Sequence, residues 1–411
     1  MMQAARAPAT AGRITALLCL AEVLTMFGYA TYPTLLTPLQ REWHLTNTES
    51  GLIGGAFFGG YMLAVPFLTT LTDRIDARRI YLLGCAMGMT GALGFAVCAE
   101  GFASAMLFQS LCGMGLAGTY MPGLKILSDR VHGPKQSRYV AFYTTSFTIG
   151  ASVSFLLPMA LVPNFGWSGA FFASAVGPVL AACLLLRVAG VPHQEAAAAG
   201  AGAPPHGALL DFRPVLRNRS AMGYILGYTA HCWELLGARS WLVAFVAFSA
   251  SLHNGASVQS AAWIAAAINL LGLPASIYGN ELAMRHGRTR VILLFMTLSG
   301  LMSAIVGFAA SLPFGLVCAL LGLHAMLVMG DSAALTAGTV AAASPNRRGT
   351  TLALHATLGF GAGLVAPAVF GLVLDLSGGG TRVAAWGWAY ASQGVFCLLV
   401  PLAWAWLHRH R

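Results

Sequence analysis

The segment that decides the fold is Thr69–Arg79, TTLTDRIDARR, a short charged turn between two long apolar runs. These runs, near 50–71 and 80–99, contain no charged residue. About twenty apolar residues cross the hydrocarbon core of a bilayer as a helix, because backbone groups in lipid must be hydrogen-bonded within the segment. Thr69–Arg79 therefore predicts two transmembrane helices joined by a basic connection.

The same pattern of apolar run and short polar connection extends in both directions along the chain. Of the 411 residues, 57% are hydrophobic and 9% are charged, whereas a soluble domain carries about 25% charged residues. This composition excludes a soluble globular protein. We expect an all-α membrane protein with twelve transmembrane helices, near 14–36, 50–71, 80–99, 105–127, 139–162, 167–187, 220–249, 258–278, 291–311, 313–335, 350–374 and 383–407.

Basic residues are divided unequally between the two sets of connections. One set contains Arg74, Arg78, Arg79 and most of the other arginines, whereas the opposite set contains only Arg41 and Arg382. Cytoplasmic connections carry an excess of Lys and Arg, so we expect both termini in the cytoplasm. The composition, rich in alanine and arginine, favours a multi-pass protein of the bacterial inner (plasma) membrane. Because the net charge of +10 is dispersed, we expect no nucleic-acid partner.

The two halves of the chain are weakly similar to each other. Arg74 and Arg285 are 211 residues apart, Glu22 and Glu234 are 212 apart, and further pairs keep an offset of 209–212. Six helices per half give a parallel repeat, a plan of secondary transporters that hold the substrate between the halves near the midplane. The expected division is an N-terminal six-helix bundle at 1–187, a cytoplasmic linker at 188–219 and a C-terminal six-helix bundle at 220–411.

The charged turn resembles a signature of the major facilitator superfamily, G-x-x-x-D-[RK]-x-G-[RK]-[RK]. Thr69 and Asp76 stand where the family has glycines, and Ala77 is an extra residue. The second-half copy, GNELAMRHGRTR, lacks the acidic residue but has Glu281 one turn before Arg285. The resemblance covers nearly the whole chain and implies a carrier that rocks two bundles about a central cavity. The implied conformational gate consists of Asp73, Arg74, Arg78, Arg79, Glu281, Arg285 and Arg288.

Other family patterns narrow the expected branch. Gln109 stands where a proton-relay arginine precedes G-x-G, and the run with Gly150, Ser154 and Pro158 lacks the Gly-Pro of drug antiporters. Both departures disfavour a drug/proton antiporter. Three stretches of the sequence resemble bacterial cyanate- and nitroimidazole-permease-like carriers: GTYMPGLKILSDR, GYTAHCWELLGARSW and GDSAALTAG. The arginines of the gate have a simpler alternative role, since they would also fix the topology.

Ionisable residues inside the spans are candidates for a function, because insertion of each one at the bilayer centre costs roughly 2.5–3.5 kcal/mol. In the seventh span, His231, Glu234, Arg239 and Tyr228 fall within an arc of about 140°. Glu234 and Arg239 are separated by a rise of about 7.5 Å, so we expect at least one of them to find a partner across a cavity. The alternative is a structural ion pair.

The first span has a similar stripe of polar residues. Glu22, Thr25, Tyr29 and Tyr32 share a face about 100° wide, which predicts the lining of a cavity. Burial favours the protonated form of a carboxyl group, a property that suits proton exchange near neutral pH. The alternative is a protonated Glu22 that only hydrogen-bonds a neighbouring helix.

Polar residues of the later spans are weaker candidates. Asp331, seven residues after His324, is expected near the cytoplasmic end of its span, where water would solvate it. His231, Glu234, His324 and His355 would bind zinc only if they converged, and the eight cysteines lack Cys-x-x-Cys spacing. We predict no metal and no cofactor. The chain lacks His-Glu-x-x-His and Gly-x-Ser-x-Gly, so we expect no enzyme.

The favoured function is secondary active transport of a small polar or anionic organic solute, coupled to protons. Glu22 and Glu234 would bind the proton, with His231 tuning Glu234, and Arg239 would anchor the solute because its guanidinium matches a carboxylate. The alternatives are an uncoupled facilitator, an anion exchanger and a multidrug-type efflux carrier. We expect a monomer whose partners are the solute, protons and the bilayer. The predicted substrate-binding residues are Arg239, Tyr29, Tyr32, Thr25, Tyr228, Asn269, His324 and His355.

Overall fold

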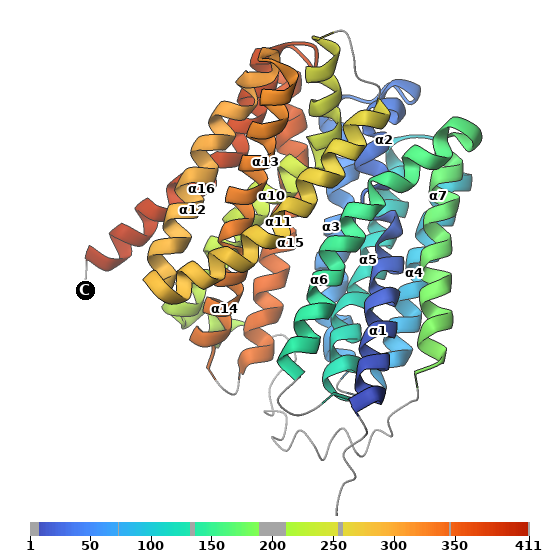
Figure 1. The fold of residues 1–411 in the computed structure, drawn as a ribbon, viewed down its shortest axis with the longest axis vertical. Coiled ribbons are helices and arrows are strands. Elements are labelled where there is room, and N and C mark those ends of the chain that lie inside the picture. Colours follow the sequence, from blue (N-terminus) through green and yellow to red (C-terminus); the bar gives the residue numbers. More distant parts are fainter. Residues whose placement is uncertain are drawn as a thin grey trace, which may run out of the picture.

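The computed structural model describes residues 8–72, 74–131, 136–188, 211–253, 258–344 and 347–409. All secondary structure in these ranges is helical, and the helices form two bundles (Figure 1). The first half of the chain, coloured blue to green, lies beside the second half, coloured yellow to red. The predicted all-α membrane fold is confirmed.

The N-terminal bundle begins with a span that a 3-10 turn interrupts, and it ends with a span that follows a kink. At the kink, Gly166 has φ 65° and ψ −176°, a positive φ that glycine adopts without steric cost. The elements of this half are α1 (Pro8–Thr25), η1 (Met26–Gly28), α2 (Thr31–Glu42), α3 (Asn47–Leu71), α4 (Ala77–Cys98), α5 (Phe102–Ser128), α6 (Gln136–Ser154) and α7 (Leu156–Leu186).

The C-terminal bundle also contains an interrupted span, in which α13 and α14 meet at Asp331. Residues 189–210 of the expected linker lie outside the described residues, so the boundaries of the halves stay a prediction. The elements of this half are α9 (Arg213–Arg217), α10 (Arg219–Ser251), α11 (Val258–His286), α12 (Arg288–Val306), η2 (Phe308–Ser311), α13 (Phe314–Gly330), α14 (Ser332–Ala342), α15 (Arg348–Leu376) and α16 (Val383–Arg409).

The number of membrane spans follows from helix length and composition. Ten stretches of the described chain are long and apolar enough to cross a membrane. One of them, Arg138–Leu186, has 49 residues and contains two spans that meet at Gly166. The remaining span is α10, whose 33 residues rise about 50 Å and which carries Glu234 and Arg239 in its interior. The predicted count of twelve is therefore confirmed, and the chain is a multi-pass membrane protein.

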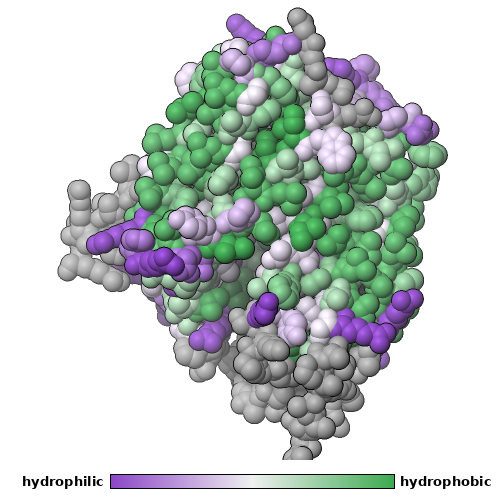
Figure 2. Space-filling model, viewed as in Figure 1, coloured by the Kyte–Doolittle hydropathy of each residue, from purple (hydrophilic) through white to green (hydrophobic). Residues whose placement is uncertain are grey.

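Apolar side chains cover much of the molecular face that Figure 2 shows. Between hydrophilic residues at the top and further hydrophilic groups at the lower left and lower right, the surface is mostly hydrophobic. Phe67, Leu107 and Ile277 are 62%, 64% and 64% exposed, as lipid-facing side chains are. We call the end that carries Arg74 and Arg285 the arginine-rich end, and the end that carries Arg382 the far end.

Two short polar motifs explain where helices begin near these ends. Thr46 and Glu49 form a capping box at the start of α3, where each side chain accepts a hydrogen bond from the other residue's backbone N–H. The carboxylate of Asp76 accepts from the backbone N–H of Arg78 and caps α4. The departure from the glycine of the family signature therefore places a helix cap in this turn.

The two halves approach each other most closely where α3 crosses α15. A Cβ atom on Gly51 would overlap the carbonyl oxygen of Pro367, and one on Gly55 would overlap that of Leu364. Small residues permit such backbone contact between membrane helices. Nearer the middle, the rings of Tyr61 and Phe360 stack with centroids 4.0 Å apart. These contacts lie between the middle of the helices and the far end.

At the far end, Asp375 of α15 caps the N-terminus of α3 from the other half. Its Oδ1 accepts from the backbone N–H (3.1 Å) and the side-chain amide (2.7 Å) of Asn47. Its Oδ2 accepts from the backbone N–H (2.8 Å) and the hydroxyl (2.6 Å) of Thr48. An anion at a helix N-terminus is stabilised by the unpaired N–H groups and by the helix dipole. The four hydrogen bonds join the halves and close the far end.

We predict that Asp375→Asn loosens the far end, because a carboxamide has one acceptor oxygen and cannot serve donors on both sides. For this exposed contact a loss of about 1 kcal/mol is reasonable, which corresponds to a shift of roughly fivefold in the open population. The reporter is Ala368→Cys, a position 9% exposed beside Gly51, labelled with a charged maleimide after the exposed Cys98 and Cys183 are replaced.

The matched control for this prediction is Glu49→Gln. It weakens the capping box on the same helix N-terminus but leaves the contact between the halves intact. Faster labelling in Asp375→Asn alone is expected. Equal labelling rates in both variants would show that Asp375 does not hold the far end closed.

Candidate functional site

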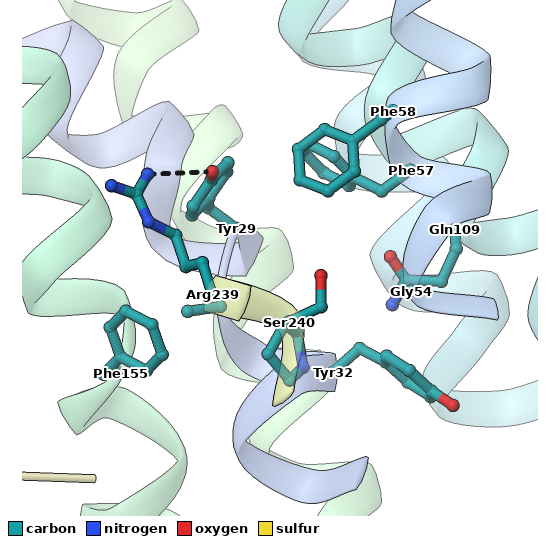
Figure 3. Close-up of a pocket in the computed structure, with 11 residues that line it drawn as sticks. Tyr29, Tyr32, Gly54, Phe57, Phe58, Gln109, Phe155, Arg239 and Ser240 are labelled. Atoms are coloured by element: carbon teal, nitrogen blue, oxygen red, sulfur yellow. Dashed lines mark hydrogen bonds between the residues drawn. The ribbon is translucent and has the colours of Figure 1, made fainter. Parts of the chain in front are cut away.

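A cavity lies between the halves near the middle of the protein (Figure 3). It contains about 330 Å³ of empty space, including its mouth. Predicted residues Tyr29, Tyr32 and Arg239 line it, and they come from η1, α2 and α10 or their junctions. The sequence did not predict the other lining residues as substrate-binding; they are Ala30, Pro33, Gly54, Phe57, Phe58, Gln109, Phe155 and Ser240.

Arg239 is the cation of this cavity. Its Nη1 donates to the hydroxyl of Tyr29 in the opposite half at 3.4 Å, the dashed line in Figure 3. The side chain is half-buried, and no carboxylate of the described ranges forms an ion pair with it. The expected contact of Arg239 across the cavity is therefore present, with a neutral partner. A partly buried guanidinium that meets only one weak neutral acceptor retains donors for an anion.

Aromatic rings fix the position of Tyr29 opposite Arg239. The ring of Tyr29 contacts Phe57, Phe58 and Phe147 edge-on, with centroids 5.6, 6.2 and 5.8 Å apart. Such edge-to-face contacts are favourable arrangements of aromatic pairs. Tyr32 directs its hydroxyl away to the carbonyl of Ser50 at 3.0 Å, so it contributes mainly its ring to the cavity wall.

A second cavity lies inside the C-terminal half and shares Arg239 with the first. Arg239, Asn269 and His324 line it among mostly apolar side chains, and it contains about 460 Å³ including its mouth. Asn269 also reaches the other half, because its Nδ2 donates to Ser152 Oγ at 2.7 Å. Three of the predicted substrate-binding residues are thus brought to one pocket.

Glu234 is enclosed in the core of the C-terminal half. It is 1% exposed, and its Oε1 lies 3.1 Å from Nε2 of His324. Its Oε2 accepts from the hydroxyl of Ser299 at 2.7 Å. Glu234 does not line either cavity itself, but His324 connects it to the second one.

His231 belongs to a neighbouring polar group in the same half. Its Nδ1 lies 2.7 Å from Oδ1 of Asp331, and both side chains are 2% exposed. Asp331 was expected in water near the end of its span. That expectation is wrong, because Asp331, at the break between α13 and α14, is only 1% exposed. Tyr228 stacks on His355 with centroids 3.7 Å apart, and Nδ1 of His355 lies 3.1 Å from the hydroxyl of Thr339.

Glu22 occupies the corresponding place in the N-terminal half. It is fully buried, and its Oε2 accepts from the hydroxyl of Tyr143 at 3.0 Å. Its Oε1 has no hydrogen-bond partner within the part of the chain that the structure describes. Thr25 lines a separate cavity between helices of this half. The two glutamates of the internal repeat are therefore both core residues, each in its own bundle.

The described residues of the expected gate lie at the arginine-rich end. Asp73 falls outside the described residues. Glu281 and Arg285 form an exposed ion pair at 2.8 Å, as their spacing of one turn suggested, and Arg288 begins α12. In the described ranges, no group of three or more His, Cys, Asp or Glu side chains is arranged to hold a metal ion.

Comparison with known proteins finds one matching family model and several partly matching relatives. A sequence model described as Major Facilitator Superfamily matches residues 18–252, more than half of the chain. Protein spinster homolog 3 of Danio rerio is 24% identical over 237 residues, 56% of this chain and 47% of that protein. The niacin transporter NiaP of Acinetobacter baylyi is 24% identical over 156 residues, 38% and 35% of the two chains. The gentisate transporter of Corynebacterium glutamicum is 24% identical over 176 residues, 41% and 38%.

These matches are partial, whereas the match to solved structures is nearly complete. The chain spans about half or less of the length of the curated relatives that it matches. A bacterial homologue of the human lysosomal transporter spinster, in an inward-facing and unoccupied conformation, has a TM-score of 0.77 at 15% identity and covers 96% of both chains. A mutant of the nucleoside transporter NupG has a TM-score of 0.77 at 14% identity and covers 95% and 98%. The fold is shared; the resemblance to cyanate-permease-like carriers stays a prediction.

Proposed function

The chain belongs to the Major Facilitator Superfamily, and we propose that it is a secondary transporter of a small organic anion. The observation that carries the proposal is Arg239, a half-buried cation between the halves whose described partner is a neutral hydroxyl. Charges within a membrane protein mark solute and ion pathways. The names of two relatives support an anion, since niacin and gentisate are both small aromatic carboxylic acids.

The arrangement of contacts supports transport by alternating access. The halves are joined from the middle to the far end through α3, α15 and the Asp375 cap. We propose that the arginine-rich end, with both chain termini, faces the cytoplasm of a bacterium and is the open end in this structure. In the opposite state, the proposed gate of Asp73, Arg74, Arg78, Arg79, Glu281, Arg285 and Arg288 would close that end.

We propose that protons drive the cycle through Glu22 and Glu234. Both carboxyl groups are fully enclosed and have few hydrogen-bond donors around them, so neutralisation by a proton offsets the cost of burying a charge. His324 provides the route from Glu234 to the pocket that contains Arg239. His231, with Asp331, would adjust the charge around Glu234 from the same helix.

The test of the anion site uses three solutes of the same ring and different charge: benzoate, benzylamine and benzyl alcohol. We predict that only benzoate raises the melting temperature of the purified protein. Arg239→Ala should weaken benzoate binding by roughly 10- to 100-fold, because a hydrogen bond to a charged group contributes about 1.5–3 kcal/mol. Arg239→Lys should retain part of the affinity, since it keeps the charge but loses the planar fork.

The control variant is Arg41→Ala, an exposed arginine at the far end. It should bind benzoate as the wild type does. Stabilisation by benzylamine instead of benzoate, or benzoate binding that survives in Arg239→Ala, would contradict an anion site at Arg239.

A further inference from the structure

We infer that the pocket inside the C-terminal half receives the solute, and that it is built for an organic anion that also carries a hydrogen-bond donor. The inference rests on the proposed transport function and specifies its substrate. The pocket lies among α10, α11, α13 and α16. Its space of about 460 Å³ includes the open mouth, and its wall is mostly apolar with a few polar side chains, as in small-molecule sites. Leu242, Ile268 and Leu321 form part of its apolar wall.

Asn269 presents an acceptor without a donor. The hydroxyl of Ser152 donates its single proton to the carbonyl of Thr148 at 2.8 Å, so its oxygen can only accept from Asn269. This fixes the orientation of the amide: Nδ2 faces Ser152, and Oδ1 is left over. Asn269 is 5% exposed, and Oδ1 has no hydrogen-bond partner among the described residues. A ligand that donates to this oxygen would remove a cost of about 1–3 kcal/mol.

Tyr390 presents a donor without an acceptor in the same pocket. Its ring is fully buried and is held between Phe245 and Phe370, at centroid distances of 4.8 and 5.2 Å. Its hydroxyl is buried, and no described residue forms a hydrogen bond with it. Buried polar groups of native proteins are almost always paired. Two unpaired groups in one pocket therefore indicate a polar occupant.

The three polar groups together define the chemistry of that occupant. Arg239 and Tyr390 both donate hydrogen bonds, which suits the oxygens of a carboxylate or a similar anion. Asn269 accepts, which suits a hydroxyl or an N–H group elsewhere on the same molecule. The apolar wall accommodates a hydrocarbon body between them. The pocket thus matches a hydroxylated or amino-substituted organic acid better than a plain carboxylate.

The experiment compares the dissociation constants of benzoate and of its meta- and para-hydroxy derivatives, measured by titration calorimetry on the full-length protein. At least one hydroxybenzoate should bind about 5- to 100-fold more tightly than benzoate. Asn269→Leu should reduce that preference to less than about twofold. Tyr390→Phe should weaken benzoate and the hydroxybenzoates by the same factor, because it removes a donor to the anionic group that they share.

Ser152→Ala is the matched control for Asn269→Leu. It breaks the same hydrogen bond between the halves but leaves Oδ1 of Asn269 unpaired, so the preference for the hydroxybenzoate should persist. Suppose that all three acids bind with equal affinity, that Asn269→Leu does not change this, and that binding still depends on Arg239. This result would overturn the present inference but would agree with the proposed transport of an organic anion. Binding of none of the three acids would contradict both proposals.

Discussion

Glu234→Gln is expected to abolish proton-driven accumulation of benzoate, while exchange of benzoate across the membrane continues. Glutamine is neutral, as a protonated carboxyl group is, so the variant is fixed in the proton-loaded form. In the wild type, transport of one proton with one anion would convert each pH unit, worth about 1.36 kcal/mol, into an accumulation of about tenfold. The variant should show no accumulation, because its proton site no longer changes occupancy.

The measurement uses proteoliposomes with a gradient of one pH unit, a clamped membrane potential and protein-free vesicles to subtract passive diffusion of the acid. An enclosed dye reports internal pH while benzoate enters. Ser299→Ala is the control, because it removes the hydroxyl that donates to Glu234 at 2.7 Å and leaves the carboxyl group in place. This control should still accumulate benzoate.

The alternative functions predict a different result for the same assay. A facilitator or an anion exchanger would move benzoate without acidifying the vesicle interior. If accumulation is unchanged in both Glu22→Gln and Glu234→Gln, proton coupling through these residues is wrong. An uncoupled carrier with the same Arg239 site would then be the better account.

The sequence was sufficient to predict the fold because span length and loop charge are imposed by the bilayer itself. Helix ends were predicted less well. The eighth span was expected at 258–278, but α11 continues to His286. The additional turns contain the exposed pair of Glu281 and Arg285, which stabilises a helix in water by i,i+4 contact. Hydropathy detects only the part of a helix that lies in lipid.

The lining of the central cavity was predictable where one helix face determined it. Tyr29, Tyr32 and Arg239 were singled out from their facing on their own spans, and all three line the central cavity. The burial of Asp331 and the place of Tyr390 in a pocket were not predicted, because the neighbours of both residues come from other helices. Asp331 is buried beside the break between α13 and α14, and Tyr390 shares a pocket with Arg239 only through tertiary packing. Periodicity along one helix carries no information on such partners.

The second large effect is expected for Gly55→Ala, which should reduce transport of benzoate and hold the far end open. A Cβ atom at this position would overlap the backbone carbonyl of Leu364 on α15, and a backbone atom cannot rotate out of the way. Overpacking of this kind costs typically about 1–3 kcal/mol. Because this cost applies only to the state in which the far end is closed, it would shift the equilibrium towards the open state by roughly 5- to 150-fold.

Gly59→Ala, one turn further along α3, distinguishes this mechanism from a general intolerance of the helix to alanine. Its Cβ would meet only the end of the Leu364 side chain, at 2.9 Å, and a leucine can change rotamer at small cost. Benzoate flux and maleimide labelling of Ala368→Cys should therefore change strongly in Gly55→Ala and little in Gly59→Ala. If both variants transport and label like the wild type, close approach of α3 and α15 is not part of the cycle. Because alanine raises helix propensity at either position, a loss confined to Gly55 can only come from the contact between the halves.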